Sequence, residues 1–164
     1  MTTPRITPCL WFDGQADDAA RFYCSVFPNS RITATTHYGE AGREHHQHAP
    51  GEILSVTFEL DGQPFMALNG GPEFRFSEAI SFQVPCRDQA EIDRYWNALL
   101  AGGGTPSQCG WLKDRFGLSW QVFPRELPTW IGDPSSPASE RVMTAMMTMS
   151  KLDLAALVRA REGR

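Results

Sequence analysis

Apolar residues recur with helical spacing in two separate segments of the chain. In each segment they fall at positions i, i+3, i+4, i+7 and i+8, which places them on one face of an amphipathic helix. Every position in the second segment lies 73 residues after its counterpart in the first. The pattern predicts helices within residues 14–30 and 87–104, and an internal repeat long enough to hold a supersecondary unit. The two stripes are Ala19, Phe22, Tyr23, Val26 and Phe27, and Ile92, Tyr95, Trp96, Leu99 and Leu100.

Strand-like segments flank both predicted helices in the same order. Residues 6–12 precede the first helix and residues 79–85 the second, while hairpins are expected over residues 56–69 and 111–123. Residues 31–38 form one further expected strand in the first half. The sequence therefore predicts two β-α-β-β-β units, which is an α+β protein with helices packed on mainly antiparallel sheet.

Within the expected strands, large apolar side chains alternate with small or polar ones. We expect the helices to cover the apolar face. The other face is either a half-exposed sheet surface or, if both halves curl toward a shared concavity, a small-molecule pocket with a few polar groups on its walls. The expected pocket wall consists of Thr7, Cys9, Trp11, Ala67, Asn69, Ser81, Gln83, Trp111, Ser119 and Gln121.

The assignment in the first hairpin depends on the length of its turn. If residues 61–62 formed a two-residue turn, Phe58 and Phe65 would share a face of the sheet. We assume a longer turn, which places Met66 and Leu68 on the helix side and their neighbours on the pocket side.

Composition and charge narrow the function classes. The 164 residues are 41% hydrophobic and 21% charged, as expected of a soluble globular chain with one substantial core. A formal net charge of −4 and the lack of a basic stripe argue against nucleic acid as a partner. Because no segment has the pattern of a signal peptide or a membrane span, we expect a cytoplasmic protein without a membrane partner. The four cysteines are far apart, so reduced thiols are expected.

Three longer segments resemble a known family. They are ITPCLWFDGQADDAARFYCSVFPNSRI, FELDGQPFMALNGGPEFRFSEAISFQVPC and CGWLKDRFGLSWQ. Together they are similar to the PhnB-like branch of the vicinal oxygen chelate, or glyoxalase-like, superfamily, a branch often labelled 3-demethylubiquinone-9 3-methyltransferase. The resemblance implies a half-barrel cup built from two modules, about residues 5–72 and 78–124 of a domain spanning 1–124. It also implies a homodimer.

The same resemblance locates where metal enzymes of the superfamily hold a divalent ion. Those positions correspond to Thr7, Ala67, Ser81 and Gln121 in this chain. None of them is a customary ligand, because a divalent ion needs several imidazoles or carboxylates to offset its desolvation. We therefore expect no metal and no cofactor in the cup.

The segment GREHHQHAPG contains three of the four histidines. His45, His46 and His48 lie between glycines in a stretch without regular periodicity, which favours a solvated polar loop. A metal site and a lid over the pocket remain the alternatives.

Other candidate chemistry is sparse. Cys109 is a candidate nucleophile, and Glu59 and Asp114 are candidate acid or base groups. Methyl transfer from S-adenosylmethionine by the common route needs a glycine loop between a strand and a helix. Glycines 102–104 instead follow a helix, and residues 69–72 connect two expected strands.

The last forty residues have a different pattern from the rest. Ser136 and Pro137 open one predicted helix, and Asp153 opens another. These two helices form a C-terminal extension, residues 125–164. The first has a methionine-rich apolar face and the second carries Leu154, Leu157 and Val158, and we expect these faces to pack on the sheet or on another subunit.

The sequence as a whole favours binding of a small organic molecule in a metal-free cup. Three alternatives remain open: a metal-dependent lyase or dioxygenase, a methyltransferase as the family label suggests, and a non-catalytic sequestration module.

Overall fold

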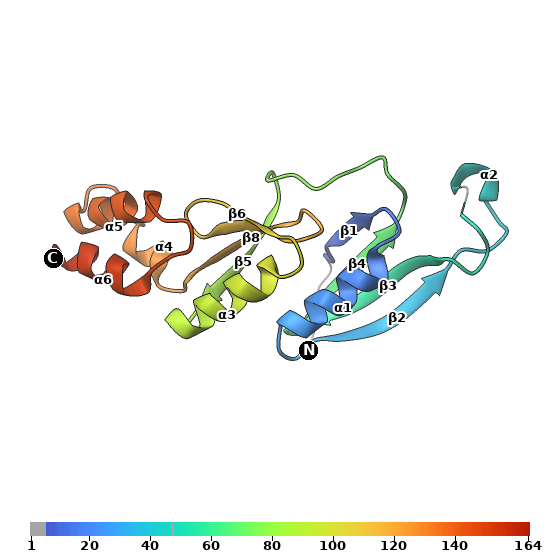
Figure 1. Cartoon of the computed structure of the whole chain (residues 1–164), viewed down its shortest axis with the longest axis horizontal. Helices are drawn as coiled ribbons and strands as arrows, with labels where there is room; N and C mark the ends of the chain where they lie inside the picture. Colours follow the sequence, from blue (N-terminus) through green and yellow to red (C-terminus); the bar gives the residue numbers. More distant parts are fainter. Residues whose placement is uncertain (1–5, 47) are drawn as a thin grey trace. The chain divides into compact units, whose positions relative to one another are not determined.

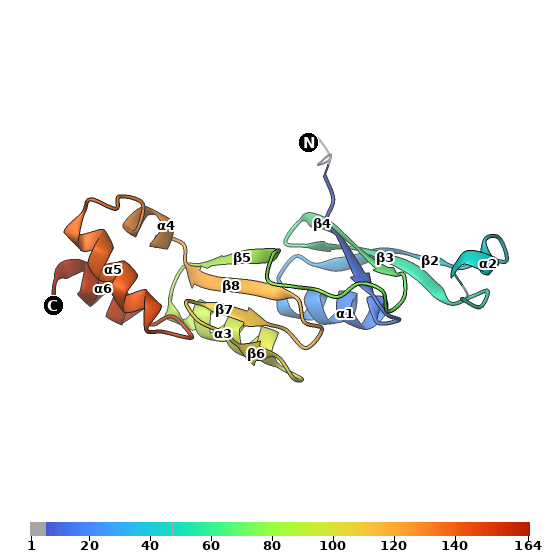
Figure 2. The same cartoon turned by 90° about the horizontal axis from the view of Figure 1, so that it is seen from above.

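The computed structural model describes residues 6–46 and 48–164, and the chain divides into two compact units, Met1–Arg75 and Phe76–Arg164. Each unit contains a four-stranded mixed sheet with a helix on it (Figure 1, Figure 2). The expected start of the first module at residue 5 lies outside the described residues.

The first unit has the order β-α-β-β-β with one additional short helix. Its sheet order is β1-β4-β3-β2, in which β1 runs parallel to β4 and the other neighbours are antiparallel. The elements are β1 (Cys9–Phe12), α1 (Ala16–Val26), β2 (Arg31–His37), α2 (Arg43–His46), β3 (Ile53–Leu60) and β4 (Gln63–Asn69).

Helix α1 forms where its apolar stripe predicts it and packs on β3 and β4. Ala19 and Tyr23 are fully buried, and the small Ala16 and Ala20 let the helix approach the sheet closely. The residue before the helix, Gln15, makes no side-chain cap. Instead, the N–H group of Ala16 donates to the side chain of Asn69, the last residue of β4.

The hairpin between β3 and β4 corrects our assumption about turn length. Leu60 pairs directly with Gln63, so the turn has two residues, and both have positive φ, 46° at Asp61 and 82° at Gly62. This geometry is that of a type I′ turn, which an Asp-Gly pair favours. Phe58 therefore pairs with Phe65 on the same face, and their rings stack with centroids 5.5 Å apart.

The second unit repeats the order of the first and then continues into helices. Its sheet order is β5-β8-β7-β6, with β5 parallel to β8. The elements are β5 (Ser81–Cys86), α3 (Gln89–Leu100), β6 (Thr105–Pro106), β7 (Trp111–Lys113), β8 (Ser119–Pro124), α4 (Leu127–Trp130), α5 (Pro137–Met147) and α6 (Leu154–Glu162).

The predicted α+β fold with a duplicated β-α-β-β-β unit is confirmed. The two sheets have equivalent strand orders and equivalent parallel pairs. Helix α3 also begins where its sequence predicts, because the Asp88 carboxylate accepts a 2.8 Å hydrogen bond from the Glu91 N–H group.

The C-terminal helices belong to the second unit and form a small core of their own. Helices α5 and α6 pack on each other and on the end of β8, and sequence analysis missed the short helix α4. Gln89 of α3 holds the linker between α5 and α6 by donating to the Leu152 carbonyl and accepting from the Leu154 N–H group. The buried members of this core are Phe123, Leu127, Val142, Leu152 and Leu157.

None of the helices in the described parts of the chain is long and apolar enough to cross a membrane.

Candidate functional site

Helix α3 covers one face of the second sheet, where Val84, Leu112 and Val122 are buried. The other face, which the C-terminal helices meet only at its Phe123 end, is called the open face below. Residues paired directly across strands share a face, so the pairing of β5, β7 and β8 defines the open one. It carries all five of the pocket residues expected in this half: Ser81, Gln83, Trp111, Ser119 and Gln121.

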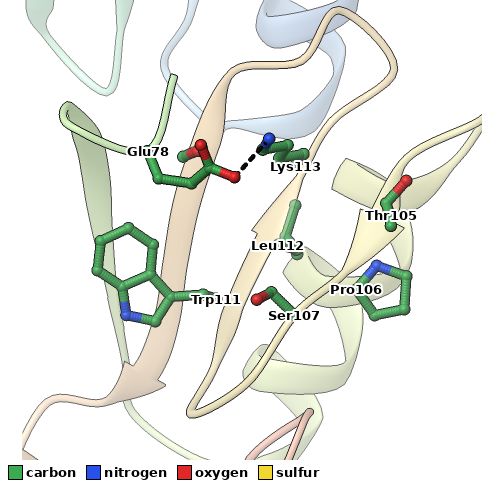
Figure 3. Close-up of a pocket in the computed structure, with 8 residues that line it drawn as sticks. Glu78, Thr105, Pro106, Ser107, Trp111, Leu112 and Lys113 are labelled. Atoms are coloured by element: carbon green, nitrogen blue, oxygen red, sulfur yellow. Dashed lines mark ion pairs between the residues drawn. The ribbon is translucent and has the colours of Figure 1, made fainter. Parts of the chain in front are cut away.

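A hollow of about 170 Å³ lies on this open face (Figure 3). We call it the polar hollow after the charged and hydroxyl side chains in its lining, which also includes Pro106 and Leu112. Trp111 and Ser119, which the sequence analysis placed on the wall of a pocket shared by both halves, belong to the lining of this hollow in the second unit. Other polar lining groups were not among the expected pocket residues: Glu78, Thr105, Ser107 and Lys113. Lys113 follows Trp111 by two positions on β7, so the alternation that indicated Trp111 also applies to Lys113.

Glu78 and Lys113 form an ion pair at the edge of this hollow. Glu78 Oε1 lies 2.5 Å from Lys113 Nζ, and Figure 3 shows the two groups pointing toward each other. The hydrogen bond from Lys113 lowers the pKa of the Glu78 carboxyl, which favours its ionised form. The pair presents both a hydrogen-bond donor and an acceptor, with no net charge.

Ser119 has an unsatisfied hydroxyl group. The residue is 1% exposed. Among the buried side-chain oxygen and nitrogen atoms of residues 6–46 and 48–164, the Ser119 Oγ is the one without a hydrogen-bond partner. Other buried serines differ: Ser139 Oγ donates to the Trp130 carbonyl at 2.7 Å. Because buried polar groups almost always find partners, an exception beside a hollow marks a place where a ligand atom can supply one.

The neighbouring polar side chains of the open face satisfy each other. Gln121 Nε2 donates to Ser81 Oγ at 2.8 Å across the parallel β5–β8 pair. Gln83, two residues after Ser81 on β5, is exposed. Trp111 lines both the polar hollow and a second hollow of about 270 Å³. Gln83 and Gln121 line the second hollow.

In the first unit, the corrected register separates the five expected residues. Cys9 and Trp11 lie on the face that α1 does not cover, together with Met66 and Leu68, which are their partners on β4. Thr7 is exposed and precedes β1. Ala67 and Asn69 lie on the opposite face and are buried, so the structure does not bring them together with Cys9 and Trp11.

Asn69 is a structural residue of the first unit. Its Oδ1 accepts from the Ala16 N–H group at 2.9 Å, which satisfies the first turn of α1, and its Nδ2 donates to the Ile53 carbonyl at 3.0 Å. The Tyr38 hydroxyl donates to the Asn69 carbonyl. Both ends of the amide are therefore occupied within the fold.

Trp11 is held in place by the glycines that follow β4. Its Nε1 donates to the Gly71 carbonyl at 2.8 Å, and a Cβ atom at position 70 would lie only 2.2 Å from the indole ring. Phe74 meets the same ring edge-on, with centroids 4.9 Å apart. Gly70 and Gly71 thus accommodate a tryptophan.

The histidine-rich segment is more ordered than a plain loop. Arg43–His46 forms the short helix α2, and the Tyr38 ring packs against the rings of His46 and His48 with centroids 4.5 and 4.2 Å apart. His48 Nδ1 lies 2.9 Å from Glu52 Oε2. Gln47, inside the segment, lies outside the described residues.

The candidate acid–base and thiol groups have structural surroundings. Asp114 is buried and accepts from the N–H groups of Phe116 and Leu118 and from the Trp120 indole, so it organises the loop between β7 and β8. Glu59 pairs with Arg31 at 3.0 Å. The four cysteines are free, and Cys109 Sγ lies 3.6 Å from the thioether sulfur of Met147.

The residues that the structure describes at the expected metal positions do not fit a divalent metal ion. In the corrected register, the open-face residues near position 67 are Met66 and Leu68, which carry no oxygen or nitrogen ligand. Ser81 and Gln121 hydrogen-bond to each other and supply no charge. Across the described ranges, no group of three or more His, Cys, Asp or Glu residues is placed to hold a metal.

Comparisons with solved structures support the fold described above. The PhnB protein from Bacillus cereus is 32% identical, with 73% of this chain and 99% of that chain covered and a TM-score of 0.63. Protein PA1353 from Pseudomonas aeruginosa is 20% identical, with 74% and 98% covered and a TM-score of 0.59. A variant of the fosfomycin resistance protein FosX from Listeria monocytogenes, in complex with Mn(II), is 14% identical, with 76% and 94% covered and a TM-score of 0.51. The latter two show likeness of fold alone.

A family model covers most of the chain. No curated protein matches the sequence. The model described as 3-demethylubiquinone-9 3-methyltransferase matches residues 4–123, which include both β-α-β-β-β units and exclude the C-terminal helices. The chain therefore belongs to this family, the PhnB-like branch of the vicinal oxygen chelate superfamily.

Proposed function

We propose that the open face of the second sheet binds a small, neutral organic molecule through a carbonyl or hydroxyl oxygen, without a metal ion. The observation that carries the proposal is the buried, unpartnered hydroxyl of Ser119 in the lining of a polar hollow. A buried hydroxyl without a partner costs roughly 1–3 kcal/mol. The Ser119 Oγ has almost no accessible surface in the empty protein. A ligand oxygen in the hollow recovers this free energy when the Ser119 side chain rotates to present its hydroxyl.

The ion pair beside Ser119 supports a neutral ligand. Lys113 and Glu78 neutralise each other at 2.5 Å, so the hollow offers no excess charge to attract an anion or a cation. An ammonium group has three donors, and the carboxylate of Glu78 uses one of them. A carbonyl oxygen near Ser119 and Lys113 is the group that these donors suit best.

The metal-free part of the proposal rests on the donor set. The FosX variant that resembles this chain in fold is a complex with Mn(II). In this chain, the positions that the superfamily's metal enzymes use correspond by resemblance to Thr7, Ala67, Ser81 and Gln121. Met66 and Leu68, which replace Ala67 on the open face of the first sheet, are also poor ligands for such an ion. Hydroxyl, amide and thioether groups without a carboxylate or imidazole bind divalent ions weakly.

The methyltransferase description of the family receives no support from the glycines. Gly70 makes room for the Trp11 ring, and Gly104 lies against the backbone of Leu100 and Lys113. Neither glycine opens a helix N-terminus toward a cofactor. We therefore propose binding of a small molecule in place of methyl transfer from S-adenosylmethionine.

Two expectations from the sequence stay within this proposal. A homodimer is implied by family resemblance, and the exposed Met143 and Met147 on α5 are suitable contact residues. A cytoplasmic location fits the reduced cysteines. Light scattering coupled to gel filtration measures the oligomeric state, and a molar mass of one chain would contradict the homodimer.

The proposal is tested by titrating 2-butanone into ¹⁵N-labelled full-length protein and following amide resonances by NMR. We expect saturable shifts centred on Ser119 and Lys113 in the wild type, and at least a tenfold weaker affinity in Ser119→Ala. Ser139→Ala, which removes a buried serine outside this hollow, serves as the matched control and keeps the wild-type affinity. Equal binding by wild type and Ser119→Ala would refute the assignment of this hydroxyl.

A further inference from the structure

The open face of the second sheet carries a second hollow next to the polar one. It has a volume of about 270 Å³, and Trp111 lines both hollows. Its lining is mainly apolar, whereas the polar hollow combines Trp111, Pro106 and Leu112 with serine, threonine and charged residues. The apolar contributions come from Phe123, Leu127, Ile131 and Met146, in addition to Trp111.

The far wall of this second hollow comes from the C-terminal extension. Leu127 belongs to α4, Ile131 follows it, and Met146 belongs to α5. All three lie beyond residue 123, where the match to the family model ends. The part of the chain that matches the family supplies Trp111 and the sheet, and the extension completes the hollow.

Two backbone hydrogen bonds attach the C-terminal extension to the chain beside this hollow. The N–H groups of Cys109 and Gly110, just before β7, donate to the carbonyls of Met149 and Ser150 at 2.8 and 2.7 Å. Ile131 and Met146 are only partly buried, although they pack against the buried core of the extension. They therefore present apolar surface to the hollow from a held position.

We infer that the ligand of this protein is amphipathic, with an oxygen-bearing end at Ser119 and an apolar chain that crosses Trp111 into the hollow walled by the extension. This inference rests on the proposed function for the position of the polar end. It adds the chemical class of the ligand, a neutral carbonyl or hydroxyl compound with a hydrocarbon tail, and gives the C-terminal helices a role in selecting it.

The experiment uses a homologous series of methyl ketones, from 2-butanone to 2-octanone, and full-length protein labelled with ¹³C at the methionine methyl groups and ¹⁵N at the backbone. Affinity is expected to rise about fourfold for each methylene group buried beyond Trp111. The Met146 methyl resonance is expected to shift with the longer ketones and not with 2-butanone. The Met66 methyl, on the first sheet, serves as the internal reference.

Two variants of the same helix provide matched controls. Met146→Gln places an amide in the hollow and is expected to flatten the dependence of affinity on chain length. Met143→Gln changes a methionine of α5 that does not line this hollow, and it is expected to leave that dependence unchanged. The Met146 methyl shift in the wild type tests the inference without any variant.

The outcomes separate the two proposals. If all ketones shift Ser119 and Lys113 equally and affinity does not depend on chain length, the inference is wrong and the proposed function stands. If the longer ketones shift Met146 but bind Ser119→Ala as tightly as the wild type, the apolar hollow binds on its own. That result overturns the position of the polar end, and with it the proposed function.

Discussion

The unpartnered hydroxyl of Ser119 predicts that removing it stabilises the empty protein. Ser119→Ala deletes a buried oxygen that has no hydrogen bond, so the variant no longer carries the cost of desolvating it. That cost is roughly 1–3 kcal/mol, and loss of the oxygen's packing contacts offsets part of it. We expect a net gain of about 1 kcal/mol in the free energy of unfolding of the second unit.

Ser139 provides a control of opposite sign in the same unit. It is also a buried serine, but its hydroxyl donates to the Trp130 carbonyl at 2.7 Å. Ser139→Ala removes this hydrogen bond, so the Trp130 carbonyl loses its donor and stability falls by about 1 kcal/mol. Both substitutions remove one hydroxyl oxygen, so side-chain volume accounts for little of the difference between them. Ser119 lies in strand β8 and Ser139 in helix α5. Because Ala is favoured in helices and disfavoured in strands, propensity opposes both expected changes in stability and does not produce them.

The assay is thermal unfolding followed by circular dichroism and checked by calorimetry. For a unit of this size, 1 kcal/mol corresponds to roughly 4–8 °C in Tm. We expect the Tm of the transition that includes the second unit to rise in Ser119→Ala and to fall in Ser139→Ala. A fall of similar size in both variants would mean that the Ser119 hydroxyl is already satisfied in the empty protein, and would remove the main argument for a ligand there.

Three further predictions concern other sites. Asn69→Ala loses the acceptor for α1 and the donor to β3, so chemical denaturation should show a loss of about 2–3 kcal/mol, and unchanged stability would contradict the capping role. The pKa of Glu78, lowered by Lys113, should return toward its ordinary value in Lys113→Met when the carboxyl carbon is titrated by NMR, and an unchanged pKa would contradict the ion pair. Because the folded-state pKa is lowered, the pair favours folding above the unfolded pKa, and this contribution is lost as pH falls through the folded pKa. Burial raises the pKa of the Cys86 thiol to about 12, so iodoacetamide at pH 8 should modify the exposed Cys9 well before Cys86, as read by peptide mass mapping; equal rates would contradict the buried position of Cys86.

The sequence was sufficient to predict the duplicated fold because its strongest signals are local. The stripes of α1 and α3 and the Asp88 cap depend on residues within a few positions of one another. The expected faces of the second sheet were also correct, since β5 and β8 pair without a register shift. These features need no knowledge of the rest of the chain.

The register of the first hairpin was wrong for an identifiable physical reason. Asp61 and Gly62 both adopt positive φ and close the turn in two residues, which shifts β4 by one position relative to our assumption. A one-residue shift exchanges the faces, so Ala67 and Asn69 became buried while Met66 and Leu68 became half-exposed. The polar character of Asn69 was misleading because its partners on α1 and β3 are distant in sequence.

The decisive features of the candidate site depend on contacts that are distant in sequence. Ser119 was among the expected pocket residues, but its lack of a hydrogen-bond partner is visible only once the whole second unit is folded. Glu78 reaches Lys113 from the segment before β5, which has no periodic pattern to indicate it. The contribution of Ile131 and Met146 to the second hollow likewise follows from the packing of the extension.

Native mass spectrometry of the tag-free protein as purified tests the central claim most directly. We predict that the wild type and Ser139→Ala carry a small, neutral, co-purified organic mass and no stoichiometric metal, and that Ser119→Ala has lost most of that mass. One divalent metal per chain, or the same organic mass held equally by wild type and Ser119→Ala, would contradict a metal-free binding site at the open face of the second sheet.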